Sequence, residues 1–309
     1  MQTLSDGAVL ADLEYLGVPG SIATCFLETA KGLAVVDPGP ANTIDRLRDV
    51  THALGATLDD VRILLLTHIH LDHAGATGWL TESLPQLRVF VHERGAPHLV
   101  DPSRLLKSAT MIYGEKMDEL WGEVKPVAGD RITALTGGER LNFGNRVIAV
   151  AYTPGHAWHH LAWFDERSGI AFTGDVLGEH LPSSDVAIPV TPPPDIDVEL
   201  MIESGDRVLE WKPAALFPTH FGLVNDPPRF AREHAARLVQ WSHHVRDSLP
   251  ESGTDEEKAQ RVAARCRREL EELIPAELHR AIPDEALYGN WFGLARYWRK
   301  KDGGNKTSQ

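Results

Sequence analysis

The segment RILLLTHIHLDHAG, residues 62–75, constrains the fold of this chain more than any other stretch. Its first half is an apolar run, which is typical of a strand buried on both faces. Its second half brings three histidines and an aspartate together as His68, His70, Asp72 and His73. We therefore expect a buried strand that ends in a loop at the edge of a sheet, where a rigid scaffold can hold a functional site.

The spacing of these four residues suits metal ions. His68 and His70 can point the same way by the two-residue period of an extended chain, while the turn carries Asp72 and His73 to the other side. Imidazole nitrogens with carboxylate oxygens suit Zn²⁺, Mn²⁺ or Fe²⁺, and a motif without thiolates argues against a structural zinc site. One short loop thus offers two pairs of ligands.

Three later apolar segments also end in a histidine or an aspartate beside turn residues. They supply His156 in TPGH, Asp175 in TGD and His220 in PTH. Each is expected to emerge at a sheet edge and to complete the site. Asp37, in the VVDPG turn, either supports the ligands from behind or forms an ordinary Asx-type turn. Three other histidines belong to no such motif and are expected beside the ligands or in solvent: His159, His160 and His180.

The rest of the chain alternates strands and helices before becoming almost entirely helical. Strands are predicted at 8–17, 21–29, 32–36, 62–66 and 88–92, with helices at 42–54 and 76–84 between them. Residues 97–125 read as helical and form either an ordinary packed helix pair or a lid over a pocket. Hairpins are predicted within 140–156 and 160–175, then a helix at 198–211 and a strand at 214–220. From residue 226 the pattern is helical, and Thr254 with Glu257 forms a capping box.

Composition excludes several classes of function. The chain has 31 Lys and Arg against 44 Asp and Glu, a formal net charge of −13, which disfavours nucleic acids and anionic membrane surfaces as partners. Its two cysteines, Cys25 and Cys266, rule out a disulfide framework and are expected to be small buried residues. The first residues do not follow the signal-peptide pattern, so we expect a cytoplasmic protein.

The ordered motifs THIHLDHAG, TPGH, TGD and FPTHFG resemble those of the metallo-β-lactamase-fold superfamily over about the first 225 residues. The resemblance implies an α+β fold, a four-layer αββα sandwich, with the site in the cleft between two sheets. The domain boundaries that follow are 1–225 for the sandwich, with 97–125 as a helical insertion, 226–302 for a C-terminal helical extension, and 303–309 for a disordered tail.

The resemblance also implies the ligands and the chemistry. His68, His70 and His156 would bind one divalent cation, Asp72, His73 and His220 a second, and Asp175 would bridge them. Zn²⁺ is favoured, with Fe²⁺ and Mn²⁺ as alternatives. Two such cations lower the pKa of a bridging water from about 15.7 to near 7, so that a hydroxide can attack a carbonyl carbon, with Asp72 orienting it as a catalytic residue.

The sequence around the predicted ligands narrows the activity to one class of reaction. Flavodiiron proteins carry an acidic residue where this chain has His70. Glyoxalase II enzymes carry Cys-Gly-Arg after the bridging aspartate, and acyl-homoserine lactonases carry a tyrosine there. This chain has neither, because its sequence at that point is GDVLGEHLPSS. A hydrolase of small-molecule esters, lactones or thioesters remains. The alternatives are a mononuclear iron sulfur dioxygenase, with two histidines and one aspartate on the metal, and a non-catalytic metal-binding module.

Aromatic residues outside the sandwich suggest where a substrate would lie. Met111, Trp121, Trp291, Phe292 and Tyr297 are dense in the helical segments, and one hypothesis is that they wall an apolar pocket over the metals. The alternative is that they pack the terminal helices onto the sandwich or onto a second copy of the chain in a homo-oligomer.

Overall fold

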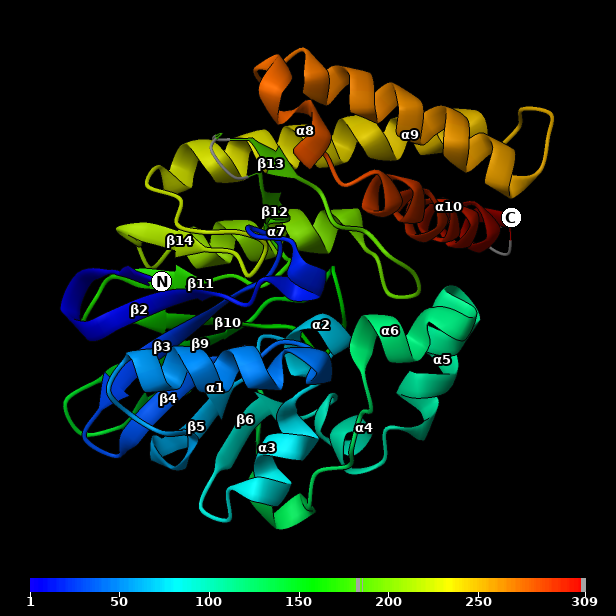
Figure 1. The fold of residues 1–309 in the computed structure, drawn as a ribbon. Coiled ribbons are helices and arrows are strands. Elements are labelled where there is room, and N and C mark those ends of the chain that lie inside the picture. Colours follow the sequence, from blue (N-terminus) through cyan, green and yellow to red (C-terminus); the bar gives the residue numbers. More distant parts are fainter. Residues whose placement is uncertain (182–183, 185, 307–309) are drawn as a thin grey trace.

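The computed structural model describes residues 1–181, 184 and 186–306, with the backbone alone described for 304–306 (Figure 1). Two large β-sheets form the centre of the molecule. The first has seven strands in chain order: β1 (Gln2–Thr3), β2 (Ala8–Asp12), β3 (Ala23–Thr29), β4 (Gly32–Val36), β5 (Val61–Leu65), β6 (Arg88–His92) and β7 (Ile132–Leu135). The second has the order β14 (Ala215–Phe217), β11 (Ile170–Phe172), β10 (Leu161–Asp165), β9 (Val147–Tyr152) and β8 (Arg140–Asn142).

The strands alternate their apolar side chains between two cores. On β3, Cys25 and Leu27 face a core between the two sheets, while Phe26 faces the helices outside the first sheet. This follows from the two-residue period of a strand. Both faces of the central strands are therefore buried, which explains why their sequences are continuously apolar.

Helices cover the outer face of each sheet, and the result is four layers. Leu47 of α1 (Ile44–Ala53) and Leu80 of α3 (Thr77–Ser83) belong to the core outside the first sheet. Val208 of α7 (Val198–Leu209) and Phe230 of α8 (Pro227–Ser248) pack outside the second. The α+β fold and its four-layer αββα arrangement, expected from the sequence, are confirmed.

The C-terminal helices form a further core beside the sandwich, which they share with Ile188 and with Met201 of α7. Helix α9 (Asp255–Glu271) begins at the capping box of Thr254 and Glu257, and α10 (Asp284–Lys306) packs on α8 and α9. Trp241 and Trp291 are fully buried between these helices. The sequence pattern predicts a disordered tail from residue 303, but residues 303–306 belong to α10. No proline stops the helix before them, and helix interiors tolerate glycine at a cost of about 1 kcal/mol each. Residues 307–309 lie outside the described residues.

The helical insertion is an excursion between β6 and β7. It contains α4 (Ala96–Val100), α5 (Ser103–Tyr113) and α6 (Met117–Trp121). The Trp121 ring stacks on Tyr15 at 5.9 Å and belongs to a small apolar cluster with Leu71. The insertion is thereby fastened to the loop that carries the histidine motif, and Figure 1 shows α5 and α6 facing α10 across the strand ends.

Cys25 and Cys266 are both buried and free, as predicted. Among the described residues, no helix combines the length and the apolar character needed to cross a membrane.

Candidate metal centre

The ends of four strands or hairpins place the seven predicted ligand residues at one edge of the sandwich. The motif after β5 carries His68 and His70, and its second half forms a helical turn, α2 (Leu71–Ala74), that holds Asp72 and His73. The spacing of the motif predicts a turn there, and the structure shows that this turn is helical. The β9–β10 connection and the segments after β11 and β14 supply the remaining three: His156, Asp175 and His220.

The seven residues form two groups that share one carboxylate. The first group is His68, His70, His156 and Asp175, and the second is Asp72, His73, Asp175 and His220. Within each group one candidate ligand atom per residue lies within 4.8 Å of all the others. The structure therefore brings together every residue that the sequence motifs singled out.

Asp175 directs one oxygen to each group. Its Oδ2 atom lies 3.9 Å from Nε2 of His68 and 3.5 Å from Nε2 of His156. Its Oδ1 atom lies 3.1 Å from Nε2 of His73 and 3.9 Å from Nε2 of His220. A carboxylate in this position can bind two cations, one through each oxygen.

Two buried polar atoms at the centre have no hydrogen-bond partner. They are Nε2 of His73 and Oδ1 of Asp175, which lie close to each other but not in hydrogen-bonding geometry. Buried polar atoms are nearly always paired, since an unpaired one costs about 1–3 kcal/mol. A divalent cation would satisfy both atoms, so the donor set fits the metals that the motifs imply.

The titratable side chains of the centre are buried close together and shift one another's pKa values. Burial and His156 lower the pKa of His70 to about 3. Burial alone would lower the pKa of His220, but its hydrogen bond with Asp72 and the charge of Asp175 raise it to about 9. Burial would raise the pKa of Asp72, but His73 and His220 outweigh it and lower the pKa to about 2. Burial would likewise raise the pKa of Asp175, but His73 and His156 hold it well below its usual range, so both carboxylates stay ionised at neutral pH.

Asp37 supports the centre from behind. Its carboxylate accepts hydrogen bonds from the backbone N–H of Thr67 at 2.8 Å, the Thr67 hydroxyl at 2.7 Å and the Thr219 hydroxyl at 2.8 Å. It also accepts from Nδ1 of His73 at 2.9 Å, which leaves Nε2 free to face the second group. Of the two roles considered for Asp37, the structure shows the supporting one, since such partners orient a histidine and fix its tautomer.

Backbone carbonyls orient two more histidines in the same way. Nδ1 of His156 donates to the carbonyl of Val190 at 3.1 Å, and Nδ1 of His220 donates to that of Ser21 at 2.9 Å. In each ring Nε2 is then the atom left for a cation. Neither partner could be recognised in the sequence, because a carbonyl oxygen is present at every residue.

The three histidines without a motif lie around the centre. His160 is fully buried, with Nδ1 2.8 Å from the Thr153 hydroxyl and Nε2 3.3 Å from the backbone N of Asp175. His159 lies against the backbone N of Ile69 at 3.4 Å, and His180 contacts the carbonyl of Phe221 at 2.7 Å. All three thus contact segments that carry proposed ligands.

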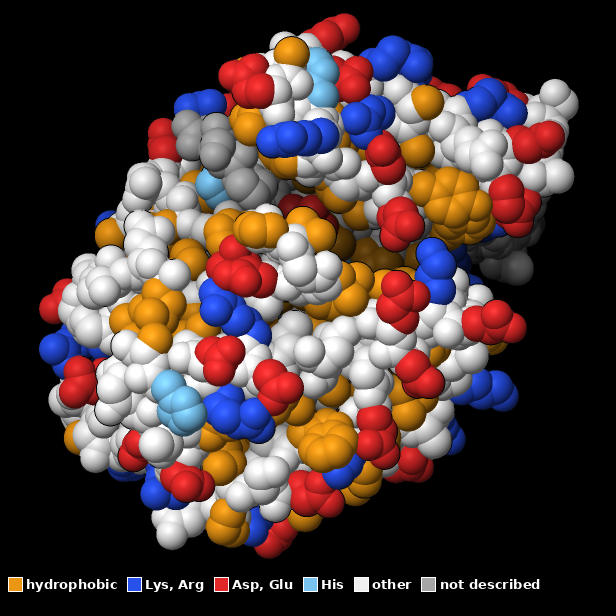
Figure 2. Space-filling view, in the orientation of Figure 1, with side chains coloured by type: hydrophobic (Ala, Val, Ile, Leu, Met, Phe, Trp, Pro, Cys, Tyr) orange, Lys and Arg blue, Asp and Glu red, His pale blue; other side chains and the backbone are white. Residues whose placement is uncertain are grey.

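The wall of the cleft includes groups that the sequence analysis did not identify. Burial raises the pKa of Glu179, on the short strand β12 (Glu179–His180), to about 7, partly opposed by His220. Burial also raises the pKa of Tyr113 to about 12, with further contributions from the Asp72 and Glu285 carboxylates. Since Glu285 belongs to α10, the end of α5 and the start of α10 face the same space. Figure 2 shows a hollow between these helices with hydrophobic side chains in it.

The predicted aromatic pocket wall is only partly found. Trp121 lies beside Leu71, next to the second ligand group. Trp291 is 1% exposed in the core of the helical extension, and the Tyr297 hydroxyl hydrogen-bonds Glu199 of α7 at 2.5 Å. Met111 is 75% exposed at the surface. Trp291 and Tyr297 are therefore packing residues, because the indole of Trp291 finds its partner on α8 and the phenol of Tyr297 finds its partner on α7.

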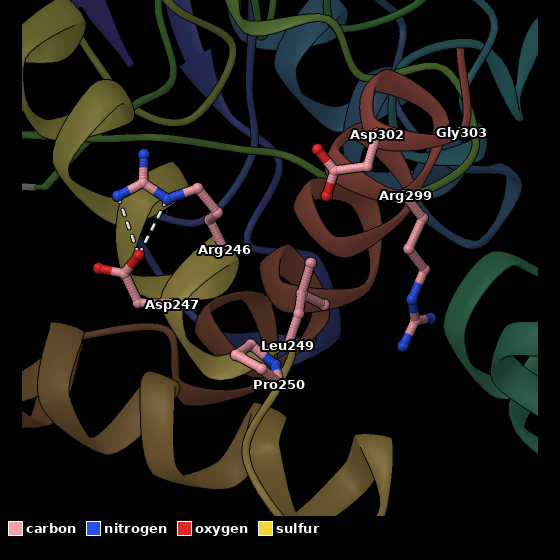
Figure 3. Close-up of a pocket in the computed structure, with 7 residues that line it drawn as sticks. All are labelled: Arg246, Asp247, Leu249, Pro250, Arg299, Asp302 and Gly303. Atoms are coloured by element: carbon pink, nitrogen blue, oxygen red, sulfur yellow. Dashed lines mark hydrogen bonds and ion pairs between the residues drawn. The ribbon is translucent and has the colours of Figure 1, made fainter. Parts of the chain in front are cut away.

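A surface depression on the helical extension is unrelated to this centre. It lies between α8 and α10 and is lined by Arg246, Asp247, Leu249, Pro250, Arg299, Asp302 and Gly303 (Figure 3). Arg246 pairs with Asp247 at 2.9 Å, and Arg299 pairs with Asp255 at 2.8 Å. Both guanidinium groups are neutralised, so the depression has little attraction for an anion.

Comparisons with known proteins agree with the fold and with the motifs. The family model described as metallo-beta-lactamase superfamily matches residues 17–220. The metallo-beta-lactamase fold-containing protein ST1585 of Sulfurisphaera tokodaii is 31% identical over 222 residues, which are 71% of this chain and 79% of that protein. A hydroxyacylglutathione hydrolase of Thermosynechococcus vestitus is 30% identical over 145 residues, 47% of this chain and 43% of the relative.

Solved structures show the same architecture. The metallo-beta-lactamase family protein TTHA1429 from Thermus thermophilus superposes with a TM-score of 0.72 at 22% identity, over 96% of this chain and 94% of that one. A match of this extent includes the helical extension as well as the sandwich. With the family model covering the segment from which all seven motif residues come, the chain belongs to the metallo-beta-lactamase superfamily.

Proposed function

We propose that this protein is a dinuclear metal-dependent hydrolase that acts on an ester, lactone, thioester or related carbonyl substrate. The observation that carries the proposal is the pair of four-residue ligand groups joined through the two oxygens of Asp175. Divalent cations in these groups would make water nucleophilic near neutral pH and polarise a carbonyl oxygen. Zn²⁺ is the cation we favour, since imidazole and carboxylate ligands with open positions suit it.

The chain's own residues would perform three tasks in this reaction. His68, His70 and His156 would hold the first cation through neutral rings, because burial lowers the pKa of each. Asp72 stays ionised, lies 3.2 Å from Nε2 of His220, and is placed to accept a proton from the attacking water. Glu179 lies on the wall of the cleft. Burial raises the pKa of its carboxyl group to about 7, so this group can exchange a proton near neutral pH.

The cleft favours a small substrate with an apolar part. Tyr15, Tyr113 and Trp121 form an aromatic cluster in which Tyr113 lies 5.1 Å from Trp121, edge to face. The charge of Asp72 acts on both tyrosine hydroxyls, which places them near the second ligand group. A carbonyl substrate bound at the metals would lay its apolar group against these rings.

The second candidate, a mononuclear iron sulfur dioxygenase, would need only two histidines and one carboxylate on the metal. The second ligand group is also complete, with Asp72, His73, His220 and the shared Asp175. Oxygen chemistry at a single iron would leave this group without a role. The geometry therefore favours hydrolysis over oxygen chemistry. A non-catalytic binding module is disfavoured by the same complete set.

The test is a substrate screen combined with metal analysis. Protein loaded with Zn²⁺ is assayed on ester, lactone, thioester and β-lactam panels, with Asp72→Ala and His156→Ala as inactive controls. The thioester panel includes a hydroxyacylglutathione, because one curated relative carries that activity in its name. We expect turnover of at least one carbonyl class and its loss in both variants. One iron per chain with oxygen consumption, and no hydrolysis, would refute the proposal.

A further inference from the structure

The proline-rich loop between β13 (Ala187–Ile188) and α7 supplies the carbonyl that orients His156. Nδ1 of His156 donates to the Val190 carbonyl at 3.1 Å, and its Nε2 atom faces the first ligand group. Residues 189–197 form no helix or strand, so no ladder of backbone hydrogen bonds holds Val190 in place. The position of this carbonyl must come from contacts with another part of the molecule.

One side chain of α10 holds the backbone on both sides of Val190. The amide of Asn290 donates from Nδ2 to the Pro189 carbonyl at 2.7 Å and accepts at Oδ1 from the backbone N–H of Thr191 at 2.6 Å. The Thr191 hydroxyl also donates to the backbone carbonyl of Asn290 at 3.3 Å. Asn290 is 5% exposed, so water competes little for these bonds. The side-chain amide therefore bonds one backbone carbonyl and one backbone N–H of the loop, as the backbone of a neighbouring strand would.

The backbone of α10 also lies unusually close to this loop. A Cβ atom added at Gly293 would lie 2.0 Å from the Thr191 carbonyl oxygen, a distance that requires a shift of backbone. Gly289, one turn earlier on the same helix, has no atom within 4 Å of such a Cβ. Between them, Trp291 fixes α10 in the helical core through a hydrogen bond from Nε1 to the Ser248 hydroxyl at 2.9 Å. The loop therefore rests on a firmly anchored helix.

We propose that Asn290 is a positioning residue for the metal centre: by clamping Pro189 and Thr191 it fixes the Val190 carbonyl, which orients the ring of His156 toward the first ligand group. The inference rests on the proposed metal centre. It assigns the helical extension a role in metal binding, although none of the seven proposed ligands belongs to α9 or α10.

The proposal predicts a selective loss of affinity. Asn290→Ala removes both bonds to the loop and lets the Val190 carbonyl move away from Nδ1 of His156. Partners that orient a ligand typically contribute 10- to 100-fold to metal affinity. We expect a loss of at least tenfold at the first group and no change at the second, because His73 and His220 are oriented by Asp37 and by the Ser21 carbonyl instead.

The experiment measures Co²⁺ affinity in two backgrounds by titration against a competing chelator. His220→Ala disables the second group and isolates the first, while His156→Ala isolates the second. Asn290→Ala is expected to weaken Co²⁺ binding at least tenfold in the first background and to leave it unchanged in the second. A smaller loss, or an equal loss in both backgrounds, would overturn the proposal. If neither background variant lowered the Co²⁺ stoichiometry by one, the metal centre itself would be wrong.

Matched glycine variants keep the test decisive if Asn290→Ala does not fold. Gly293→Ala should displace the loop and reproduce the selective loss, whereas Gly289→Ala adds the same methyl group to the same helix in open space and should leave Co²⁺ affinity unchanged. Both substitutions favour the helix itself. A second readout is the exchange of the His156 Nδ1 proton with water in the Zn²⁺-loaded protein, measured by NMR. It should accelerate in Asn290→Ala and Gly293→Ala only, and an unchanged rate in both would contradict the clamp.

Discussion

At the scale of single residues, the buried carboxylate of Asp37 joins three segments of the chain behind the metal centre. This carboxylate accepts four hydrogen bonds, and their donors follow β5 and β14 or belong to α2. The residue itself adopts a left-handed backbone conformation, with φ at 50°. Such a conformation is uncommon for a residue other than glycine, although aspartate is among those that tolerate it. The bonds to Thr67, His73 and Thr219 offset that cost.

Replacing Asp37 should therefore affect both stability and metal binding. We expect Asp37→Ala to lower the free energy of unfolding by several kcal/mol, since it leaves buried donors unpaired, and to weaken Zn²⁺ binding by 10- to 100-fold. Thr219→Val, which removes one of the four donors, should cost only about 1 kcal/mol. Urea unfolding of the metal-free protein and Zn²⁺ titration measure the two effects. Wild-type affinity in Asp37→Ala would show that the carboxylate does not orient His73.

His234 provides a pH-dependent prediction away from the centre. It is fully buried on α8, and neither ring nitrogen has a hydrogen-bond partner. Burial, with the charge of Arg237, lowers its pKa to about 3. Below pH 6.5 the unfolded chain binds a proton at this ring and the folded chain does not, so stability falls as the pH decreases from about 6.5 toward 3.

Substitution of this ring should remove that loss. One proton contributes about 1.4 kcal/mol per pH unit, so His234→Leu should reduce the loss of stability between pH 7.5 and 4.5 by roughly 2.5 kcal/mol. His243→Gln, on the exposed face of the same helix, should leave the pH dependence as in the wild type. Urea unfolding at several pH values measures both. Parallel pH profiles for His234→Leu and the wild type would refute the assignment.

The sequence identified the candidate ligands and offered Asp37 as their support, but it did not identify the other groups that orient them. His68, His70, Asp72 and His73 are recognisable because their spacing is unusual and they follow a buried strand. The other orienting groups are the Thr219 hydroxyl, the Val190 and Ser21 carbonyls and the Asn290 amide, and such groups occur throughout any chain. Only the fold brings Thr219 to Asp37 or Asn290 to Pro189.

At the scale of elements, the helical insertion and the helical extension border the same cleft but are held differently. Helix α10 packs on both α8 and α9 in a large apolar core. Leu99 of α4 is buried in the core outside the first sheet, but the buried residues of α5 and α6 form only a small cluster, in which Ala109 and Trp121 pack with Leu71 of α2. Segments with few buried apolar contacts open more readily than the core. The insertion is therefore the part of the cleft wall that we expect to open first.

Trp121 should hold the insertion closed. Trp121→Ala removes the stack on Tyr15 and the packing against Leu71, a change that typically costs about 3–5 kcal/mol. We expect faster amide hydrogen exchange throughout α5 and α6 with an unchanged Zn²⁺ content. Met111→Ala, at an exposed position of the same insertion, should have no effect on exchange. Unchanged exchange in Trp121→Ala, or loss of metal, would contradict this view of the insertion.

Element prediction succeeded where the apolar period is regular. The buried strands β4, β5 and β6 and the amphipathic helices α1, α7 and α9 lie where their patterns placed them. The role of aromatic residues was harder to predict, because an aromatic ring suits a core as well as a pocket. Trp291 and Tyr297 are examples, since the choice between the two depended on where Ser248 and Glu199 lie in space.

For the whole molecule, the centre joins segments that are distant in sequence, so metal binding should stabilise the entire sandwich. The ligands span His68 to His220 and come from both sheets. Binding to the folded state alone adds about 4 kcal/mol when the free cation is at 1,000 times its dissociation constant. Removal of the metals with a chelator should therefore lower the Tm, and readdition of Zn²⁺ should restore it. An identical Tm with and without metal, by calorimetry, would contradict a site formed only by the folded chain.

The central claim is that two groups of ligands, sharing Asp175, each hold a divalent cation. The most direct test is the number of bound metal ions per chain, determined by elemental analysis of the wild type, His156→Ala and His220→Ala after loading with Zn²⁺ and removal of the excess. The account predicts two ions in the wild type and one in each variant. A single ion in the wild type, or two ions retained in both variants, would contradict it.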